Sequence, residues 1–389
     1  MKKILMGLST VLLFTVLLLT MPSEDIKAKA VSDLYQLPAP IIDVFPDEGL
    51  ATDMAKNLQK DSVNDVIDQD DLDTLKILGF ETESITNDSM KLLERAMFNN
   101  VTDVGIMEFG EELTEFPDIT TIPHLETLLF NKPPETLTRN LSLPDYQNYP
   151  EMDSITLSGN NLIGSIPDFT GMPDLKHLSI TDMSIRSDEI PDFKNIPLLL
   201  TLDLSGNQVT TIPDFQNTPE LLELVLGENQ INDIPDFQNI PNLITLDLSF
   251  NNLTKTMTNF THLPHLINLD LDYNHLNELP SNVLSSTFVE NQKGTVPDQT
   301  INQGETCTIQ LPIYSQMAEI NMLVNPEIKG FYAADIPQYV SATSNADTET
   351  ITLDTSELSP GVYKFNVQFN MAYPVTNEGC VYDWELTIN

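Results

Sequence analysis

Basic residues are scarce in this 389-residue chain, which has 18 Lys and Arg against 58 Asp and Glu and a formal net charge of −40. An acidic surface of this kind repels phosphate backbones and anionic lipid headgroups. The composition therefore argues against binding to nucleic acid or insertion into a membrane. It favours solubility, cationic partners or divalent cations.

Motifs for catalysis and for cofactor binding are missing from the sequence. The five histidines are dispersed, and the closest pair, His262 and His265, has no evident third metal ligand nearby. No glycine-rich phosphate loop occurs, and neither cysteine lies in a motif typical of a nucleophile. We therefore expect a protein that is not an enzyme and that has no cofactor and no metal centre.

Cysteine is almost absent, since the chain has only Cys307 and Cys380. Two cysteines in one domain of an exported protein are a candidate disulfide, although spacing does not show that they lie close together. In the chain-entropy model, closing a loop of this length would stabilise the fold by about 4 kcal/mol.

Long apolar runs are confined to the N-terminus, where "ILMGLSTVLLFTVLLLTM" follows Lys2 and Lys3 and precedes an A-x-A site at 28–30. This order predicts a secretory signal peptide over residues 1–30, with an uncleaved anchor as the alternative. No later run of eighteen apolar residues exists. The chain ends in "DWELTIN", without a sorting-signal-like tail. We expect a secreted, extracellular protein, with loose wall association as the alternative.

A 22-residue pattern dominates residues 98–287 and has the form L-x-x-L-x-L-x-x-N-x-I-x-x-I-x-x-F-x-x-I-x-x. This period predicts a leucine-rich-repeat solenoid, an α/β horseshoe with a thin convex side. Each turn has one short strand whose leucines point inward. The repeat Asn is also expected to point inward and to bond to backbone groups exposed at the bend. Its positions are Asn160, Asn207, Asn229, Asn251 and Asn274, and Met183 stands in place of the Asn in the turn that starts at Leu175. The prolines of each "IPDF" segment follow the strand, on the return side, where no ladder needs an N–H. About eight turns are predicted, starting at Val101, Leu125, Met152, Leu175, Leu199, Leu221, Leu243 and Leu266.

The regions on either side of the repeats lack this period. Residues 41–97 are acidic, and "PDEGLATDMAKNLQK" spaces Leu50, Met54 and Leu58 at i, i+4 and i+8, so short helices are predicted there. The segment "QDDLDTLKIL" likewise places carboxylates ahead of Leu72, Leu75 and Leu78, and a second short helix is predicted there. Residues 288–389 contain alternating segments bounded by turn residues, which predict a small antiparallel β-sandwich. Because the ends of a solenoid need caps, we expect these two regions to provide them.

These features together resemble the internalins, exported leucine-rich-repeat proteins of Gram-positive bacteria. The 22-residue consensus is similar to theirs, and "VFPDEGLATDMAKNLQKDSVNDVIDQDDLDTLKILGF" looks like their helical N-terminal cap. The resemblance implies that 41–97 is such a cap and that 288–389 is an Ig-like β-sandwich. It also implies a released protein that binds a host or cell-surface protein.

The outward positions of the predicted strands are candidate ligand-binding positions on the concave face. Two aromatics precede the Asn of the last two turns, and aromatic side chains commonly anchor interfaces. A merely solvated face is the alternative. The candidate residues are Asp203, Glu223, Val225, Thr245, Asp247, Phe250, Asp270, Asp272 and Tyr273.

A second feature is the row of carboxylates in the "PDF" segments, at Asp168, Asp192, Asp214 and Asp236. Calcium could relieve repulsion along such a row. We favour instead a structural role, in which each Asp caps its own short turn through backbone N–H groups. The acidic "DQDDLD" at 68–73 lacks the glycine and terminal Glu of an EF-hand loop, and it is predicted to begin a helix.

Two functions from different classes fit the sequence. One is an extracellular module that binds a host or cell-surface protein through its concave face. The other is a structural or spacer protein of the bacterial wall, whose acidity binds cations or wall polymers.

Overall fold

The computed structural model describes the chain in several stretches. They are residues 36–81, 86–91, 93–107, 119, 121–130, 149–159, 166–254, 260–277, 287–288, 292–310, 323–331, 342–345, 350–356, 358–371 and 380–389. The predicted signal peptide lies outside them. Among the described residues, no helix has both the length and the apolar character needed to cross a membrane. The chain divides into two compact units, Met1–Met172 and Pro173–Asn389.

The first unit begins with short helices and a two-stranded ribbon. Strand β1 (Ala39–Pro40) pairs antiparallel with β2 (Val66–Ile67), and helices α3 (Ile41–Val44) and α4 (Glu48–Asn57) lie between them in the chain. Helix α4 begins where Leu50 N donates to the Asp47 carboxylate at 2.7 Å. The predicted helical spacing is confirmed, because Leu50 and Met54 are both buried.

The segment "DQDDLD" begins helix α5 (Gln69–Asp73) through a capping box. Asp71 N donates to Asp68 Oδ1 at 3.0 Å, and Asp68 N donates to Asp71 Oδ2 at 3.1 Å. A short helix was also expected to continue towards Leu78, and this was wrong. Residues Ile77–Phe80 form strand β3 because they pair with the strand at 103–106, and their side chains then alternate between outward and buried positions.

The remaining elements of the first unit are helix α6 (Asn87–Met90) and three more strands, β4 (Asp103–Ile106), β5 (Thr127–Phe130) and β6 (Ser154–Ser158). Strand β3 pairs parallel with β4, β4 with β5, and β5 with β6. Each strand alternates buried and half-buried residues, as the repeat requires.

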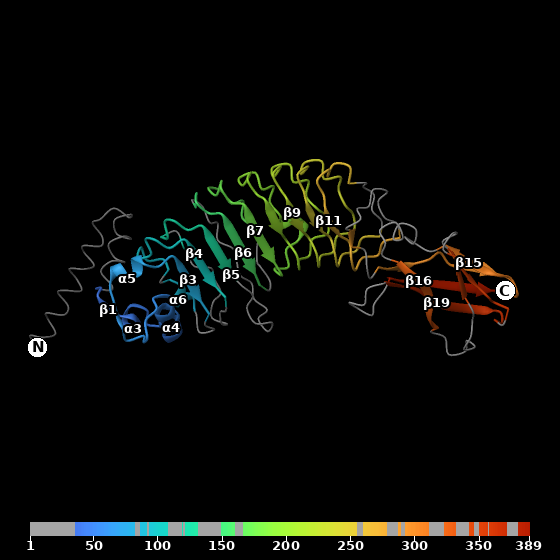
Figure 1. Cartoon of the computed structure of the whole chain (residues 1–389), viewed down its shortest axis with the longest axis horizontal. Helices are drawn as coiled ribbons and strands as arrows, with labels where there is room; N and C mark the ends of the chain where they lie inside the picture. Colours follow the sequence, from blue (N-terminus) through green and yellow to red (C-terminus); the bar gives the residue numbers. More distant parts are fainter. Residues whose placement is uncertain are drawn as a thin grey trace, which may run out of the picture. The chain divides into compact units, whose positions relative to one another are not determined.

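The second unit continues the repeat through β7 (His177–Thr181), β8 (Thr201–Asp203), β9 (Glu223–Val225), β10 (Thr245–Asp247), β11 (Asn268–Asp270) and β12 (Thr287–Phe288). Within it, successive strands pair in parallel, and Figure 1 shows β9 and β11 in this stack. Leu202, Leu224 and Leu246 are fully buried, in one column. In both units, β4 to β11 each begin two residues after a predicted repeat start. The leucine-rich-repeat solenoid is thus present.

The return side of several turns contains a phenylalanine with a left-handed backbone conformation. Phe193, Phe215 and Phe237 have φ of 52°, 51° and 50°, although non-glycine residues rarely adopt positive φ. All three side chains are buried, and the rings of Phe193 and Phe215 stack with centroids 6.4 Å apart. Burial of the ring compensates for the unfavourable positive φ of the backbone. The tight left-handed bend keeps the return side thin.

The end of the second unit, after the solenoid strands, consists of two sheets. One contains β13 (Lys293–Thr295), β14 (Gln299–Ile301), β16 (Leu323–Phe331), β19 (Gly361–Met371) and β20 (Cys380–Ile388). The other contains β15 (Cys307–Gln310), β17 (Ala342–Asn345) and β18 (Thr350–Leu353).

A purely antiparallel arrangement was expected here, and this was wrong. Strands β13 and β14 both pair parallel with β20, because the chain that leaves the solenoid runs alongside the C-terminal strand. Strand β12 belongs to the solenoid sheet, since it pairs parallel with β11. Tyr382, on β20, is fully buried and donates its hydroxyl to Leu276 O at 2.6 Å. The C-terminal strand therefore contacts the last turn of the solenoid.

Candidate protein-interaction surface

The outward side chains of β8 to β11 and of the turns that follow them form one surface of the second unit, here called the strand face. Its side chains are half-buried or exposed, while the leucines between them are buried. All nine residues predicted to bind a ligand lie on it. The register Asp203–Val225–Asp247–Asp270 puts one column of these residues in adjacent strands.

Two aromatic side chains stack on the strand face. The rings of Phe250 and Tyr273 have centroids 4.0 Å apart and an interplanar angle of 9°. Both residues have positive φ, and Phe250 N donates to Asp272 O at 2.9 Å, which holds the two turns in register. Phe250 nevertheless remains 47% exposed. Tyr273 is half-buried, so the pair offers the exposed ring of Phe250 on a stacked support, which gives apolar contact area with little loss of side-chain freedom on binding.

Three acidic residues of the strand face also support the turns that follow their strands. The carboxylates of Asp203, Asp247 and Asp270 each accept the backbone N–H of the residue two positions later, at 2.8 to 2.9 Å. These bonds fix the start of each turn. The sequence pattern predicts these residues only as contacts, and the structure adds this local role.

Beneath the strand face, a column of asparagines joins neighbouring turns. The Asn229 amide donates to Leu204 O and Leu226 O, and its Oδ1 accepts Val209 N at 2.9 Å. The predicted inward role of the repeat asparagines is confirmed here. The same pattern recurs along the column at Asn207, Asn251 and Asn274. The predicted member Asn160 lies outside the described residues.

Two positions beside these asparagines depart from the repeat consensus, at Met183 and at Gln292. Where Met183 replaces the Asn, Asn207 Oδ1 accepts both Met183 N and Ile185 N, at 3.1 and 3.0 Å. At the second position, fully buried Gln292 accepts Leu276 N and donates to Leu271 O at 2.7 Å. Gln292 therefore performs the role of the next asparagine. Its longer side chain and its place outside the period hid this role in the sequence.

Comparison with known proteins agrees with this architecture. Residues 28–73 match the family model described as the N terminus of bacterial adhesion/invasion proteins, Internalin_N, and residues 242–263 match the leucine-rich-repeat model. The structure of InlP from Listeria monocytogenes is similar, with 66% identity, a TM-score of 0.81, and coverage of 92% of this chain and all of that one. This chain belongs to the internalin family.

A second solved structure is also similar to this internalin. The internalin-like protein lmo2027 of Listeria monocytogenes shares 72% identity over 92% of this chain and all of that one, with a TM-score of 0.70. Among curated proteins, none matches the chain. Internalins and leucine-rich-repeat proteins are in general non-catalytic and bind other proteins, so a protein-interaction role follows for this chain.

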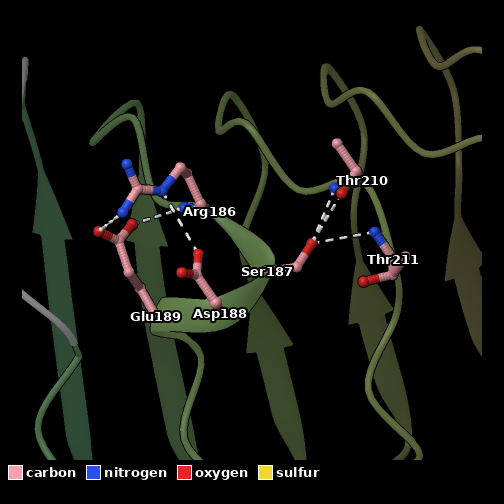
Figure 2. Close-up of polar contacts among 6 residues, drawn as sticks. All are labelled: Arg186, Ser187, Asp188, Glu189, Thr210 and Thr211. Carbon is pink, nitrogen blue, oxygen red and sulfur yellow. Dashed lines mark hydrogen bonds and ion pairs between the residues drawn. The ribbon is translucent and has the colours of Figure 1, made fainter.

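One turn of this internalin contains a local polar cluster (Figure 2). The turn that begins with β7 is two residues longer than the 22-residue consensus and includes the 3₁₀ helix η1 (Ser187–Glu189). Arg186 contacts Glu189 at 3.1 Å and Asp188 at 3.3 Å. Ser187 Oγ accepts the N–H groups of Thr210 and Thr211, each at 2.9 Å. The Ser187 bonds join two turns at the exposed surface, four residues after Met183, which stands in place of the Asn.

The "PDF" carboxylates have the structural role that the sequence favoured. Asp168, Asp192, Asp214 and Asp236 each accept the backbone N–H two residues later, at 3.1 to 3.3 Å. Within the part of the chain that the structure describes, no group of three or more His, Cys, Asp or Glu residues is arranged to hold a metal ion.

The candidate disulfide differs in the structure from its prediction. Cys307, on β15, is a free and buried cysteine, whose thiol donates to Gln299 Oε1 at 3.0 Å. Burial raises the pKa of this thiol to about 11, so it is protonated at neutral pH. The side chain of Cys380 lies outside the described residues.

Proposed function

We propose that this internalin is an exported, non-catalytic protein that binds a host or cell-surface protein through its strand face. The stacked Phe250–Tyr273 pair, in which Phe250 is exposed and Tyr273 half-buried, carries the proposal. A large aromatic side chain that remains accessible on a rigid surface is the kind of residue that contributes most to protein interfaces. The internalin match over residues 28–73 supports an adhesion role.

The proposal includes a domain organisation. Residues 1–30 are a signal peptide, 41–97 a helical N-terminal cap, 98–287 about eight leucine-rich turns, and 288–389 an Ig-like C-terminal domain. Helices α3, α4 and α5 support the first cap, since they precede the first strand of the repeats. The bond from Tyr382 to Leu276 supports the second, because it covers the open end of the last turn.

The rigidity of the strand face supports binding without rearrangement. Buried asparagine amides and the carboxylate-capped turns fix the backbone on both sides of each strand. The strand-face side chains are therefore held in position before a partner arrives, which reduces the entropy lost on binding. Glu223, Asp247 and Asp270 add negative charge, so basic residues are expected on the partner opposite them.

A double substitution of the aromatic pair tests this proposal. Mature protein from residue 31 onward would carry Phe250→Ala and Tyr273→Ala, and its binding to animal cells would be measured by flow cytometry. We expect at least a tenfold weaker binding, because two anchors of about 1.4 kcal/mol or more in total are removed. Val362→Ala is a matched control, since Val362 is 57% exposed on β19, outside the strand face.

Unchanged cell binding by the double variant, with its fold intact by circular dichroism, would contradict a strand-face site.

The alternative function, a wall-associated spacer, predicts a different distribution in culture. Free protein in the medium supports the released adhesin, whereas retention on purified cell walls supports the spacer, whose acidity would bind cations or wall polymers.

A further inference from the structure

An aliphatic row lies directly before strands β8 to β11 of the second unit, one position ahead of the first outward residue of each strand. It consists of Leu200, Leu222, Ile244 and Ile267, which occupy the same position of four successive turns. The backbone N–H groups of Leu222, Ile244 and Ile267 each donate to the carbonyl of the preceding member of the row, at 2.8 Å. The four side chains therefore lie in register, about 5 Å apart.

Exposure of the aliphatic row increases along the solenoid. Leu200 and Leu222 are half-buried, Ile244 is 36% exposed and Ile267 is 59% exposed. Scattered exposed aliphatic residues are normal on protein surfaces, but contiguous apolar positions often mark interaction sites. Repetition at one position over four turns makes this row contiguous. At its N-terminal end the same position is Lys176, whose carbonyl accepts Leu200 N, so the apolar row ends there.

Carboxylates border the aliphatic row. Glu220 and Glu223 are exposed and lie two residues before and one residue after Leu222. Beyond them, Asp203, Asp247 and Asp270 lie three residues after members of the row. At the positions two residues before and one residue after the four members of the row, no Lys or Arg occurs. A partner that covers the row must therefore place positive charge against this border.

We infer that the aliphatic row binds a cationic amphipathic helix of the partner protein, and this rests on the proposed function. The spacing favours a helix over a strand. Side chains three and four apart on a helix are about 5–6 Å apart, close to the spacing of the turns. Same-face side chains of a strand are about 6.8 Å apart and lose register after one or two turns. A helix laid along the row contacts it with residues i, i+3 or i+4, and i+7.

Two synthetic peptides test this inference directly. Each is a helical 16-residue peptide with leucines at i, i+4, i+7 and i+11, and the flanking positions are all Arg in one peptide and all Glu in the other. Binding to the mature protein is measured by fluorescence anisotropy. We expect the Arg peptide to bind at least tenfold more tightly than the Glu peptide, and its affinity to fall as salt is raised. Equal affinity of the two peptides would overturn the inference.

Variants locate the site. Ile244→Ser together with Ile267→Ser is expected to weaken binding of the Arg peptide about tenfold, and Glu220→Gln with Glu223→Gln severalfold. Both pairs are on the surface, so the fold is retained. Val362→Ser removes a comparably exposed aliphatic residue elsewhere and is expected to change nothing. If Val362→Ser lowers the affinity for the Arg peptide as much as the two isoleucine substitutions do, the assignment of the peptide site to the aliphatic row is overturned.

Cell binding separates this inference from the proposed function. If the Ile244→Ser/Ile267→Ser protein binds animal cells as tightly as wild type, the helix site is wrong while the adhesin function stands. If wild type does not bind the cells, the proposed function is wrong. If the Ile244→Ser/Ile267→Ser substitutions weaken both peptide binding and cell binding, the aliphatic row is part of the partner-binding site.

Discussion

The helical segment at 41–81 and the regular turns at 199–277 use polar side chains in opposite ways. In the helical segment, Asp47 and Asp68 bond to backbone groups three residues away, at partly exposed helix starts. In the regular turns, buried Asn229 bonds to groups 20 and 25 residues away as well as to its own turn. Acidic residues therefore stabilise single helices, whereas buried amides hold one turn to the next.

This difference has an energetic consequence. A helix cap at the surface contributes about 1 kcal/mol, and water can replace part of its bonds. A buried amide of the asparagine column has no such replacement, because its partners are buried with it. Damage to one column residue should also affect two turns together, since stability in a solenoid depends on neighbouring interfaces.

The largest effect is expected for Asn229→Leu. The substitution leaves buried Val209 N without its acceptor and removes one bond each from the carbonyls of Leu204, Leu226 and Gly227. These carbonyls keep the bonds from Asn207 Nδ2, Asn251 Nδ2 and Gly206 N, so the expected cost is about 3 kcal/mol in the free energy of unfolding. Urea denaturation measures it. Hydrogen exchange should show reduced protection in both adjoining turns.

Asn217→Ala is the matched control for this prediction. Asn217 makes one exposed bond, from Nδ2 to Asp192 O at 2.9 Å, so the loss should be about 0.5 kcal/mol. Equal losses for the two asparagines would contradict the distinction between buried and exposed amides.

An intermediate effect is expected for Asp71→Asn in helix α5. The hydrogen bond from Lys60 Nζ at 2.8 Å, with smaller support from Asp68 N–H, lowers the pKa of the Asp71 carboxyl. A carboxyl with a lowered folded pKa stabilises the fold above its unfolded pKa of about 3.9 and loses this contribution as pH falls through the folded value. The variant should be less stable by about 1 kcal/mol or less at pH 7.

The pH dependence distinguishes this ion pair from other effects of the substitution. The difference in the free energy of unfolding between wild type and Asp71→Asn should be constant from pH 5 to 7 and shrink below about pH 4. Asp70→Asn, at an exposed position of the same helix start, serves as the control. A difference that persists unchanged at pH 2 would contradict the ionic contribution.

The smallest effect is expected for the "PDF" carboxylates. Asp236→Ala removes the exposed bond from Gln238 N, at 3.3 Å, and should cost about 0.5 kcal/mol. Asp236→Asn should cost less, because an Asn side chain can accept the same bond. Calcium should leave the melting temperature of both proteins unchanged. A calcium-dependent rise in wild type that Asp236→Asn abolishes would show that the row binds the ion.

Local chemistry was predictable from the sequence wherever the bonding partner is close in the chain. The start of α5, the spacing of Leu50 and Met54 in α4, and the capping role of the "PDF" aspartates all follow from residues two to four apart. The repeat was equally clear, because one consensus recurs and each turn must bury the same positions. The nine candidate contact residues all lie on the strand face, although their binding role remains a prediction.

Other features depended on partners far away in the chain. The strand at 77–80 forms because β4 lies beside it, and no local signal distinguishes its apolar residues from those of a helix. Gln292 replaces an asparagine from outside the period, since it lies next to the last turn. The aliphatic row was overlooked because its members are isolated in sequence and become neighbours only when turns stack.

The sequence by itself determined the solenoid, its period, its inward leucines and asparagines, and the acidic character of its surface. These depend on composition and on a repeated local pattern. The tertiary structure decided how the solenoid ends, with Gln292 and Tyr382 bonding to the last turn. It also decided which outward residues meet, such as Phe250 with Tyr273. The physical reason is that stacking brings residues about 22 positions apart to within one strand spacing, and contacts at that range are set by packing.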